Sequence, residues 1–270
     1  MRRLKYLWII ACCLLALPVF PKKKKTAHYE PLFGKSAAAY SITSTSLKGA
    51  EIYLVSGHGG PDPGCIGKYK GRELHEDEYA YDIVLRLGRE LLKRGATVHF
   101  IIQDAKDGIR NQAILSNSKR ETCMGKEIPL NQVARLQQRC DAINRLYRRG
   151  AGTYRRAVFI HVDSRQRNNQ TDVFFYHSPG SRNGKRLAQS LQTTFGKKYD
   201  KHQPNRGFGG SVSERNLYVL RNTTPVGVFL ELGNIQNPQD QKRLVIPANR
   251  QALANWITES IVADYKRSRK

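Results

Sequence analysis

Short apolar runs alternate with amphipathic helical patterns along most of this chain, and this alternation constrains its fold more than any other feature of the sequence. Several of the runs are apolar at consecutive positions, which is typical of strands covered on both faces, as in a parallel sheet. The predicted strands cover residues 52–55, 97–102, 157–162, 172–176 and 226–232. Strands that alternate with helices predict a single α/β domain, with a mostly parallel twisted sheet flanked by helices.

The helices are predicted from apolar side chains that recur every three or four residues. In the first of them Tyr79, Ile83 and Leu87 share one stripe, and Gly95 follows as a C-terminal stop. The predicted helices cover residues 76–93, 130–148, 182–195 and 249–265. Between the second strand and the second helix, a long polar stretch predicts a surface loop near the functional site, over residues 104–129.

The first part of the chain differs in composition from the rest. Basic residues flank an uncharged, mostly apolar stretch at residues 6–20. This stretch is shorter than the ~20 residues that span a bilayer, so residues 1–25 are predicted to be a signal peptide, with an N-terminal membrane anchor as the open alternative. Residues 26–49 sustain no periodicity and are predicted to be a linker, which leaves the folded domain over residues 50–267. Such a leader predicts an exported protein that is periplasmic or otherwise associated with the cell envelope.

The charge of the chain is strongly unbalanced. Lys and Arg number 46 against 22 Asp and Glu, which gives a formal net charge of +24. A charge of this size predicts a polyanionic partner, such as nucleic acid, an anionic membrane or an anionic cell-wall polymer. The basic residues are scattered, and neither an RNA-stacking motif nor a zinc finger is present, so specific binding to nucleic acid is disfavoured. An anionic wall or membrane surface is the expected partner.

The cysteines do not form a metal-binding pattern. Beyond the N-terminal segment the chain has Cys65, Cys123 and Cys140, and no two of them have CxxC spacing. A cysteine-rich zinc ribbon is therefore excluded. In an exported protein Cys123 and Cys140 could form a disulfide, and free thiols are the equal alternative.

Three of the predicted strands end next to a residue that is able to do chemistry. His58 follows the first strand within a glycine-rich loop, and His161 and Glu231 lie near the ends of two later strands. Glu76 opens the helix after the His58 loop, on the stripe that faces the core, where an unpaired carboxylate is costly. In an open α/β sheet ligands bind beyond the carboxyl ends of the strands, so these four side chains are expected to converge.

The residue types in this group suit a metal ion. Two imidazoles and one carboxylate, from His58, Glu76 and His161, suffice to hold one zinc ion, which keeps a fourth position for water in catalytic sites. Because zinc lowers the pKa of bound water to ~7, Glu231 is predicted to act as a general base and then as the acid that protonates a leaving amine. Glu73 is a reserve carboxylate. Taken singly, each residue also fits a simpler interpretation, as a hydrogen-bonded core histidine or an acid beside a helix dipole.

Four stretches carry a resemblance to a known family. They are VSGHGGPDPGCIG at residues 55–67, EDE at 76–78, FIHVD at 159–163 and LELGNIQN at 230–237. In these stretches, and in the order of its elements, the chain resembles the zinc-dependent N-acetylmuramoyl-L-alanine amidases of bacterial cell walls, the type-3 amidase family.

The resemblance implies one zinc ion per chain, held by His58, Glu76 and His161, with Glu231 as the general base and acid. It also implies hydrolysis of the amide bond between N-acetylmuramic acid and L-alanine of the stem peptide, in peptidoglycan or in soluble muropeptides. The chain departs from the family pattern at several positions, which leaves its substrate preference open. These positions are Val55, Ser56, Cys65, Asp163 and Asn234.

A different class of function is the main alternative. A non-catalytic peptidoglycan-binding module could have the same fold, with its basic residues supplying the affinity. The complete set of site residues weighs against it, because a binding module needs no full metal set. The sequence does not indicate the oligomeric state, and it assigns no role to Asp62 or Asn237.

Overall fold

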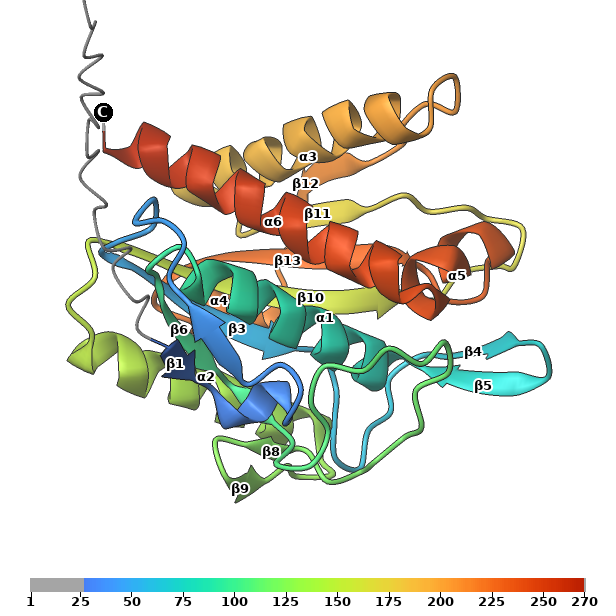
Figure 1. The fold of residues 1–270 in the computed structure, drawn as a ribbon, viewed down its shortest axis with the longest axis horizontal. Helices are drawn as coiled ribbons and strands as arrows, with labels where there is room; N and C mark the ends of the chain where they lie inside the picture. Colours follow the sequence, from blue (N-terminus) through green and yellow to red (C-terminus); the bar gives the residue numbers. More distant parts are fainter. Residues whose placement is uncertain (1–26, 270) are drawn as a thin grey trace, which may run out of the picture.

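The computed structural model describes residues 27–269, which fold around a central six-stranded sheet in the order β12-β11-β13-β10-β3-β6 (Figure 1). Neighbouring strands are parallel except for the pair β11 and β13. The predicted mostly parallel sheet is therefore confirmed. The strands of this sheet are β3 (Ala50–Ser56), β6 (Thr97–Phe100), β10 (Tyr154–Asp163), β11 (Phe174–His177), β12 (Ser211–Glu214) and β13 (Val226–Asn234).

Helices cover both faces of the sheet (Figure 1). One face packs against α1 (Glu76–Leu92), α3 (Arg182–His202), α5 (Pro238–Val245) and α6 (Pro247–Ser268). The other face packs against α2 (Gln132–Arg149) and α4 (Tyr218–Asn222). The third helix continues past the predicted end at residue 195, and α4 and α5 were not predicted from the sequence.

Alternate residues of each central strand enter two separate hydrophobic clusters. Leu54 and Val158 belong to the cluster under α1, α3 and α6. Tyr53 and Phe159 belong to the cluster under α2 and α4. Successive side chains of a strand point to opposite faces, and here both faces are covered. This two-sided burial explains why the strands are apolar at consecutive positions.

The segment before the sheet differs from the linker predicted over residues 26–49. Its described part contains β1 (Ala27–Tyr29), which pairs with β2 (Ala39–Ser41), and a 3-10 turn between them. Phe33 and Leu47 are fully buried in the first cluster, and Phe33 packs edge-on against Phe100 with ring centroids 5.7 Å apart. Residues 27–49 are therefore part of the folded domain.

The signal peptide or anchor predicted over residues 1–25 lies outside the described residues. Among residues 27–269, no helix is both long enough and apolar enough to cross a membrane. The three cysteines that the structure describes, Cys65, Cys123 and Cys140, carry free thiols. Of the two states left open for Cys123 and Cys140, the structure therefore has the unpaired one.

Two small sheets border the loop that carries His58. The hairpin of β4 (Ile66–Tyr69) and β5 (Arg72–His75) leads from this loop into α1. In the second sheet β8 (Thr122–Cys123) pairs with both β7 (Ile102–Gln103) and β9 (Lys126–Glu127). The stretch predicted as one long loop thus ends in two short strands.

Candidate active site

The carboxyl ends of β3, β10 and β13 lie side by side at one edge of the sheet. The three strands are parallel, and His161 of β10 is in register with Glu231 of β13. Residues in register on neighbouring strands point to the same face of a sheet. His58 lies two residues beyond the end of β3, and Glu76 is the first residue of α1. The structure therefore brings the four predicted site residues to one edge.

Glu76 lies between two imidazole rings. Its Oε1 atom is 2.9 Å from Nδ1 of His161, and its Oε2 atom is 3.2 Å from Nε2 of His58. The backbone amides of Cys65 and Val162 donate hydrogen bonds to the same carboxylate, at 2.9 and 3.0 Å. The metal-ligating atoms of His58, Glu76 and His161 all lie within 4.8 Å of one another. The three residues predicted as metal ligands thus form one compact group.

Two glycines permit this close approach. A Cβ atom on Gly57 would overlap the imidazole ring of His161. A Cβ atom on Gly64 would lie 2.7 Å from Oε2 of Glu76, and Gly64 also has a φ of +69°, which L side chains rarely adopt. Because Gly57 and Gly64 have no side chain, the loop after β3 can approach the imidazole of His161 and the carboxylate of Glu76 this closely.

The polar contacts give the two histidines different proton affinities. Burial opposes a charge on His58, but hydrogen bonds with Asp62 and Glu76 outweigh it and raise the pKa of His58 to about 10. Burial lowers the pKa of His161, although its hydrogen bond with Glu76 opposes this. Burial would raise the pKa of Glu76, yet hydrogen bonds with both histidines hold it below its ordinary value. Glu76 is therefore the anionic centre of the group.

Glu231 adds a second carboxylate with a different environment. Its Oε2 atom is buried and has no hydrogen-bond partner within residues 27–269. Burial, and then the charges of Glu76 and Asp163, raise the pKa of Glu231 well above its ordinary value. Leaving a buried acceptor unsatisfied costs about 1–3 kcal/mol. Such a group beside a candidate metal site is available to a ligand.

A cavity of about 220 Å³ opens beside the two histidines, between the sheet and the helices α2 and α4. Its walls are mainly apolar, with Leu136, Phe159, Val219 and Phe229 among the lining residues. Phe229 stacks on the ring of His161 with centroids 4.2 Å apart. The site therefore has an apolar wall on the side that faces α2 and α4.

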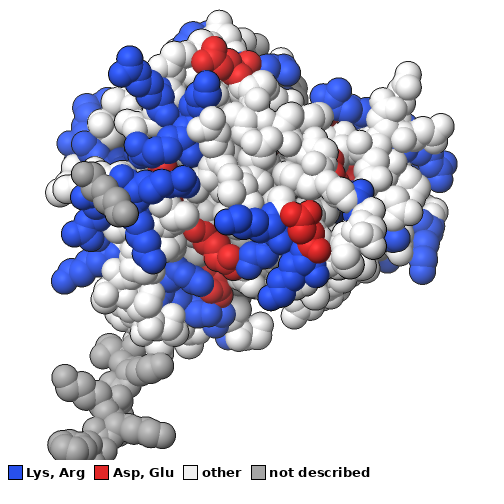
Figure 2. Space-filling model, turned by 90° about the horizontal axis from the view of Figure 1, so that it is seen from above, with Lys and Arg blue, Asp and Glu red and all other residues white. Residues whose placement is uncertain are grey.

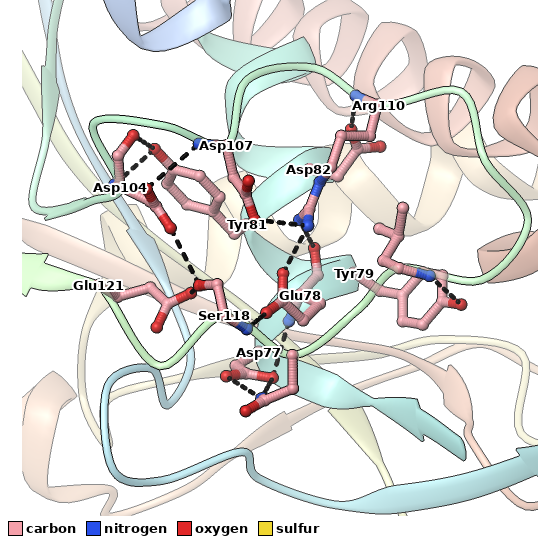
Figure 3. A network of polar contacts seen from close by, with 12 residues as sticks. Asp77, Glu78, Tyr79, Tyr81, Asp82, Asp104, Asp107, Arg110, Ser118 and Glu121 are labelled. Carbon is pink, nitrogen blue, oxygen red and sulfur yellow. Dashed lines mark hydrogen bonds and ion pairs between the residues drawn. The ribbon is translucent and has the colours of Figure 1, made fainter. Parts of the chain in front are cut away.

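A second group of acidic side chains begins on the same turn of α1 (Figure 3). Asp77, Glu78 and Glu121 are buried, and one oxygen of each lies within 4.8 Å of the others. Glu78 forms an ion pair with Arg110 at 2.7 Å, and its other oxygen accepts a hydrogen bond from the amide of Ser118 at 2.5 Å. This group was not predicted from the sequence, because Glu121 and Arg110 come from the long polar loop, and no pattern along the chain shows the path of that loop.

The group of Asp77, Glu78 and Glu121 connects the long loop to the loop that carries His58 and to α1. Glu121 accepts a hydrogen bond of 2.8 Å from the amide of Gly60, in the loop that carries His58. The side-chain amide of Asn117 donates to Asp77 at 3.2 Å. Burial, and then the carboxylates of Glu78 and Glu121, raise the pKa of Asp77 to about 8. The acidic side chains thus have partners within the protein, which is what a structural network requires.

The structure also shows where three other residues named from the sequence lie. Glu73, the reserve carboxylate, lies outside the site: its side chain is 59% exposed and 3.2 Å from Nε2 of His75. Asn237 caps α5, where its side chain accepts hydrogen bonds from two backbone amides. Asn234 is fully buried and donates to two backbone carbonyls of the loop after β10. This asparagine, one of the departures from the family pattern, organises that loop.

The residues of the site fit a zinc ion. Zinc accepts histidine nitrogen and glutamate oxygen, and catalytic zinc sites use three such ligands. His58, Glu76 and His161 supply this set, with an anionic carboxylate between two imidazoles. The unsatisfied oxygen of Glu231 belongs to the same edge of the sheet.

Comparison with known proteins connects this fold to one family. The family model for N-acetylmuramoyl-L-alanine amidase matches residues 52–263. A relative from Staphylococcus aureus, described as "Probable cell wall amidase LytH", is 29% identical over 218 residues, which are 80% of this chain. The chain spans 58% of the length of this curated relative.

Solved structures share the fold. The N-acetylmuramoyl-L-alanine amidase from Clostridium difficile 630 aligns with a TM-score of 0.57 at 20% identity, over 80% of this chain and 97% of that one. The CwlD amidase from Clostridioides difficile, solved in complex with the GerS lipoprotein, aligns with a TM-score of 0.58 at 19% identity, over 80% of this chain and 98% of that one. Since the family model covers the chain from β3 to α6, this protein belongs to the N-acetylmuramoyl-L-alanine amidase family.

Proposed function

We propose that this protein hydrolyses the amide bond between N-acetylmuramic acid and L-alanine of the peptidoglycan stem peptide, with one zinc ion per chain. His58, Glu76 and His161 would hold the ion, and Glu231 would transfer protons. Membership of the amidase family supports an amide hydrolase that acts on the cell wall. The observation that carries the catalytic assignment is the buried, unsatisfied carboxylate oxygen of Glu231 beside the three ligands.

The proposed chemistry divides between the ion and the protein. When bound, zinc supplies a Lewis acid that polarises a carbonyl oxygen and lowers the pKa of water. Glu231 removes a proton from the attacking water and donates it to the amine of L-alanine as the C–N bond breaks. The lactyl carbonyl carbon gains the hydroxyl group and the amine gains the proton, so one water is consumed per bond. Burial of Glu231 suits both proton transfers, because it favours the protonated form between them.

The cavity is the proposed binding site for the groups on either side of the scissile bond. The lactyl group and the alanine each carry a methyl group, and the cavity walls near His161 are apolar. Phe229 covers one face of the His161 ring, so water has no access to the ring from that side. We assign the cavity to these small apolar groups of the substrate.

We further propose that the protein works outside the cytoplasm on an anionic surface, either the wall or the membrane. The net charge of +24 supports this, and Figure 2 shows Lys and Arg side chains spread over one face with few acidic ones between them. Salt screens the attraction between the basic protein and an anionic surface, and at 0.1 M ionic strength little of it remains beyond about 10 Å. Binding to purified sacculi is therefore expected to weaken as salt increases, which a pelleting assay would measure.

The function is tested with the full chain and purified peptidoglycan, by mass spectrometry of the soluble products. The parent is expected to release stem peptides that begin with L-alanine. Glu231→Gln is expected to retain zinc and to lose activity by about 10²–10⁴-fold, the usual contribution of a general acid and base. Glu259→Gln is the matched control, because its side chain is 45% exposed and pairs with Lys198.

The contrary results are equally specific. Release of peptides at the parental rate by Glu231→Gln would remove Glu231 from the mechanism. Wall binding without any release, by a parent that contains zinc, would contradict the proposed reaction. Wall binding without zinc or release would favour the non-catalytic binding module.

A further inference from the structure

Arg139 is a buried cation beside the candidate metal site. It lies on α2, and 3% of its surface is exposed. Its guanidinium group donates to the backbone carbonyls of His58 and Arg135 and forms no ion pair within the described part of the chain. Its Nε atom is buried and has no hydrogen-bond partner there. Burial of a charge without a carboxylate partner is costly, so stability alone does not account for this residue.

The carbonyl that Arg139 holds belongs to a residue with an unusual backbone. His58 has a φ of +59°, in the left-handed region that residues other than glycine rarely adopt. Such conformations persist where the surrounding structure imposes them, and they concentrate at functional sites. Arg139 contacts this residue directly, from the helix that forms one wall of the cavity.

A second arginine, Arg135, is linked to the imidazole of the same residue through Asp62. Nδ1 of His58 is 2.7 Å from Oδ2 of Asp62, and that oxygen is 2.6 Å from Nη2 of Arg135. The other oxygen of Asp62 accepts a hydrogen bond of 3.2 Å from the amide of Gly64. Arg135 and Arg139 are four residues apart, which places them on the same face of α2.

We propose that Arg135 and Arg139 are positioning residues that orient His58 as a metal ligand. Arg139 holds the backbone carbonyl, and Arg135 holds Asp62 against Nδ1. With Nδ1 committed to Asp62, Nε2 faces Glu76 and is the nitrogen that remains for the metal. Carboxylates that accept from the second nitrogen of a ligating histidine set its tautomer and ring orientation. This inference rests on the zinc ion of the proposed function, and it adds a role for α2.

The test measures the dissociation constant for zinc, by competition between the full chain and a chromogenic chelator. Arg139→Gln and Asp62→Asn are each expected to weaken zinc binding by about 10–100-fold, the usual effect of losing such an outer partner. Arg139→Lys keeps the charge and one donor, and is expected to recover part of the loss. Arg145→Gln, at an exposed position of the same helix, is the control and should bind zinc like the parent.

A purely structural role would give a different result. In that case Arg139→Gln would lower the melting temperature, but the folded protein would bind zinc with the parental constant, which would overturn the proposal. If Arg139→Gln does not fold, Asp62→Asn decides, because it leaves the helix unchanged. Weaker zinc binding in the variants supports the positioning role even if the parent cleaves no peptidoglycan. Parental binding in both Asp62→Asn and Arg139→Gln contradicts the role even if the parent is an active amidase.

Discussion

Three consecutive acidic residues open α1, and they enter two different clusters. Glu76 lies between two histidines, next to an apolar cavity and to an unsatisfied carboxylate. Asp77 and Glu78 turn into a network that includes Arg110 and the long loop (Figure 3). Both clusters bring three ligand groups within 4.8 Å, so proximity does not distinguish them. The difference lies in their partners.

The partners decide what each cluster is able to do. In the network around Glu78, a guanidinium, amides and a hydroxyl of the loop contact the carboxylates, which ties the loop to the helix. In the cluster around Glu76, two backbone amides donate to the carboxylate, and its side-chain neighbours are two imidazoles, which can bind a metal ion in place of a proton. The two clusters therefore differ in the side chains around their carboxylates: imidazoles, which are metal ligands, at Glu76, and a guanidinium at Glu78.

The largest expected effect separates the two clusters by their metal content. Glu76→Ala removes the carboxylate between the imidazoles, so the protein is expected to lose its zinc, as measured by elemental analysis. Amidase activity should fall on the order of 10³-fold, because several kcal/mol of stabilisation by the metal are lost. Glu73→Ala, at an exposed side chain outside the site, should keep both zinc and activity. If Glu76→Ala retained one zinc per chain, the ion would have to lie elsewhere, and the comparison would break.

A smaller effect is expected on stability at the other cluster. Arg110→Gln leaves the buried Glu78 without its cation, which is expected to lower the free energy of unfolding by about 3–5 kcal/mol. Arg120→Gln removes a guanidinium that is 43% exposed and pairs with Asp104 and Asp107. This control should cost about 1 kcal/mol or less. Denaturant titration measures the free energy of unfolding of both variants. Equal losses of stability would show that the ion pair of Arg110 with Glu78 contributes no more than an exposed ion pair.

The smallest effect depends on pH. Burial would raise the pKa of Asp104, but hydrogen bonds from the amides of Lys106 and Asp107, with further help from Ser118, lower it. The ionised carboxylate therefore stabilises the fold above its ordinary pKa of 3.8, and this stabilisation is lost as the pH falls below that value. Asp104→Asn should cost about 1 kcal/mol at pH 7 and progressively less below pH 4. A cost that stayed constant down to pH 3 would contradict this assignment.

The sequence predicted the parts of the fold that depend on repeated patterns. The consecutive apolar runs of β3, β10 and β13 indicated strands buried on both faces, and the structure confirms the sheet. The prediction of a linker over residues 26–49 is wrong for residues 27–49, because Phe33 and Leu47 are buried by packing on distant residues and follow no local period. The same limitation explains why α4 and α5, which are short, were missed.

In the site, too, the features that follow local patterns were predicted and those that depend on long-range contacts were not. His58, Glu76, His161 and Glu231 were found because the order of strands and helices brings strand ends and one helix start to the same edge of a parallel sheet. The partners of these residues were not found. Arg139 contacts His58 across 81 residues of sequence, and no pattern along the chain reports such a contact.

The sequence by itself therefore determined the α/β architecture, the four candidate site residues and the family resemblance, because these follow from local periodicity and from motifs at strand ends. Only the tertiary structure decided which carboxylates have partners, where the cavity lies, and how α2 reaches the His58 loop. The physical reason is that hydrogen bonds, ion pairs and burial depend on atoms brought together by folding. Glu76 and Glu78 are the same residue type in the same turn of α1, and what distinguishes them is the set of groups that the fold places around each.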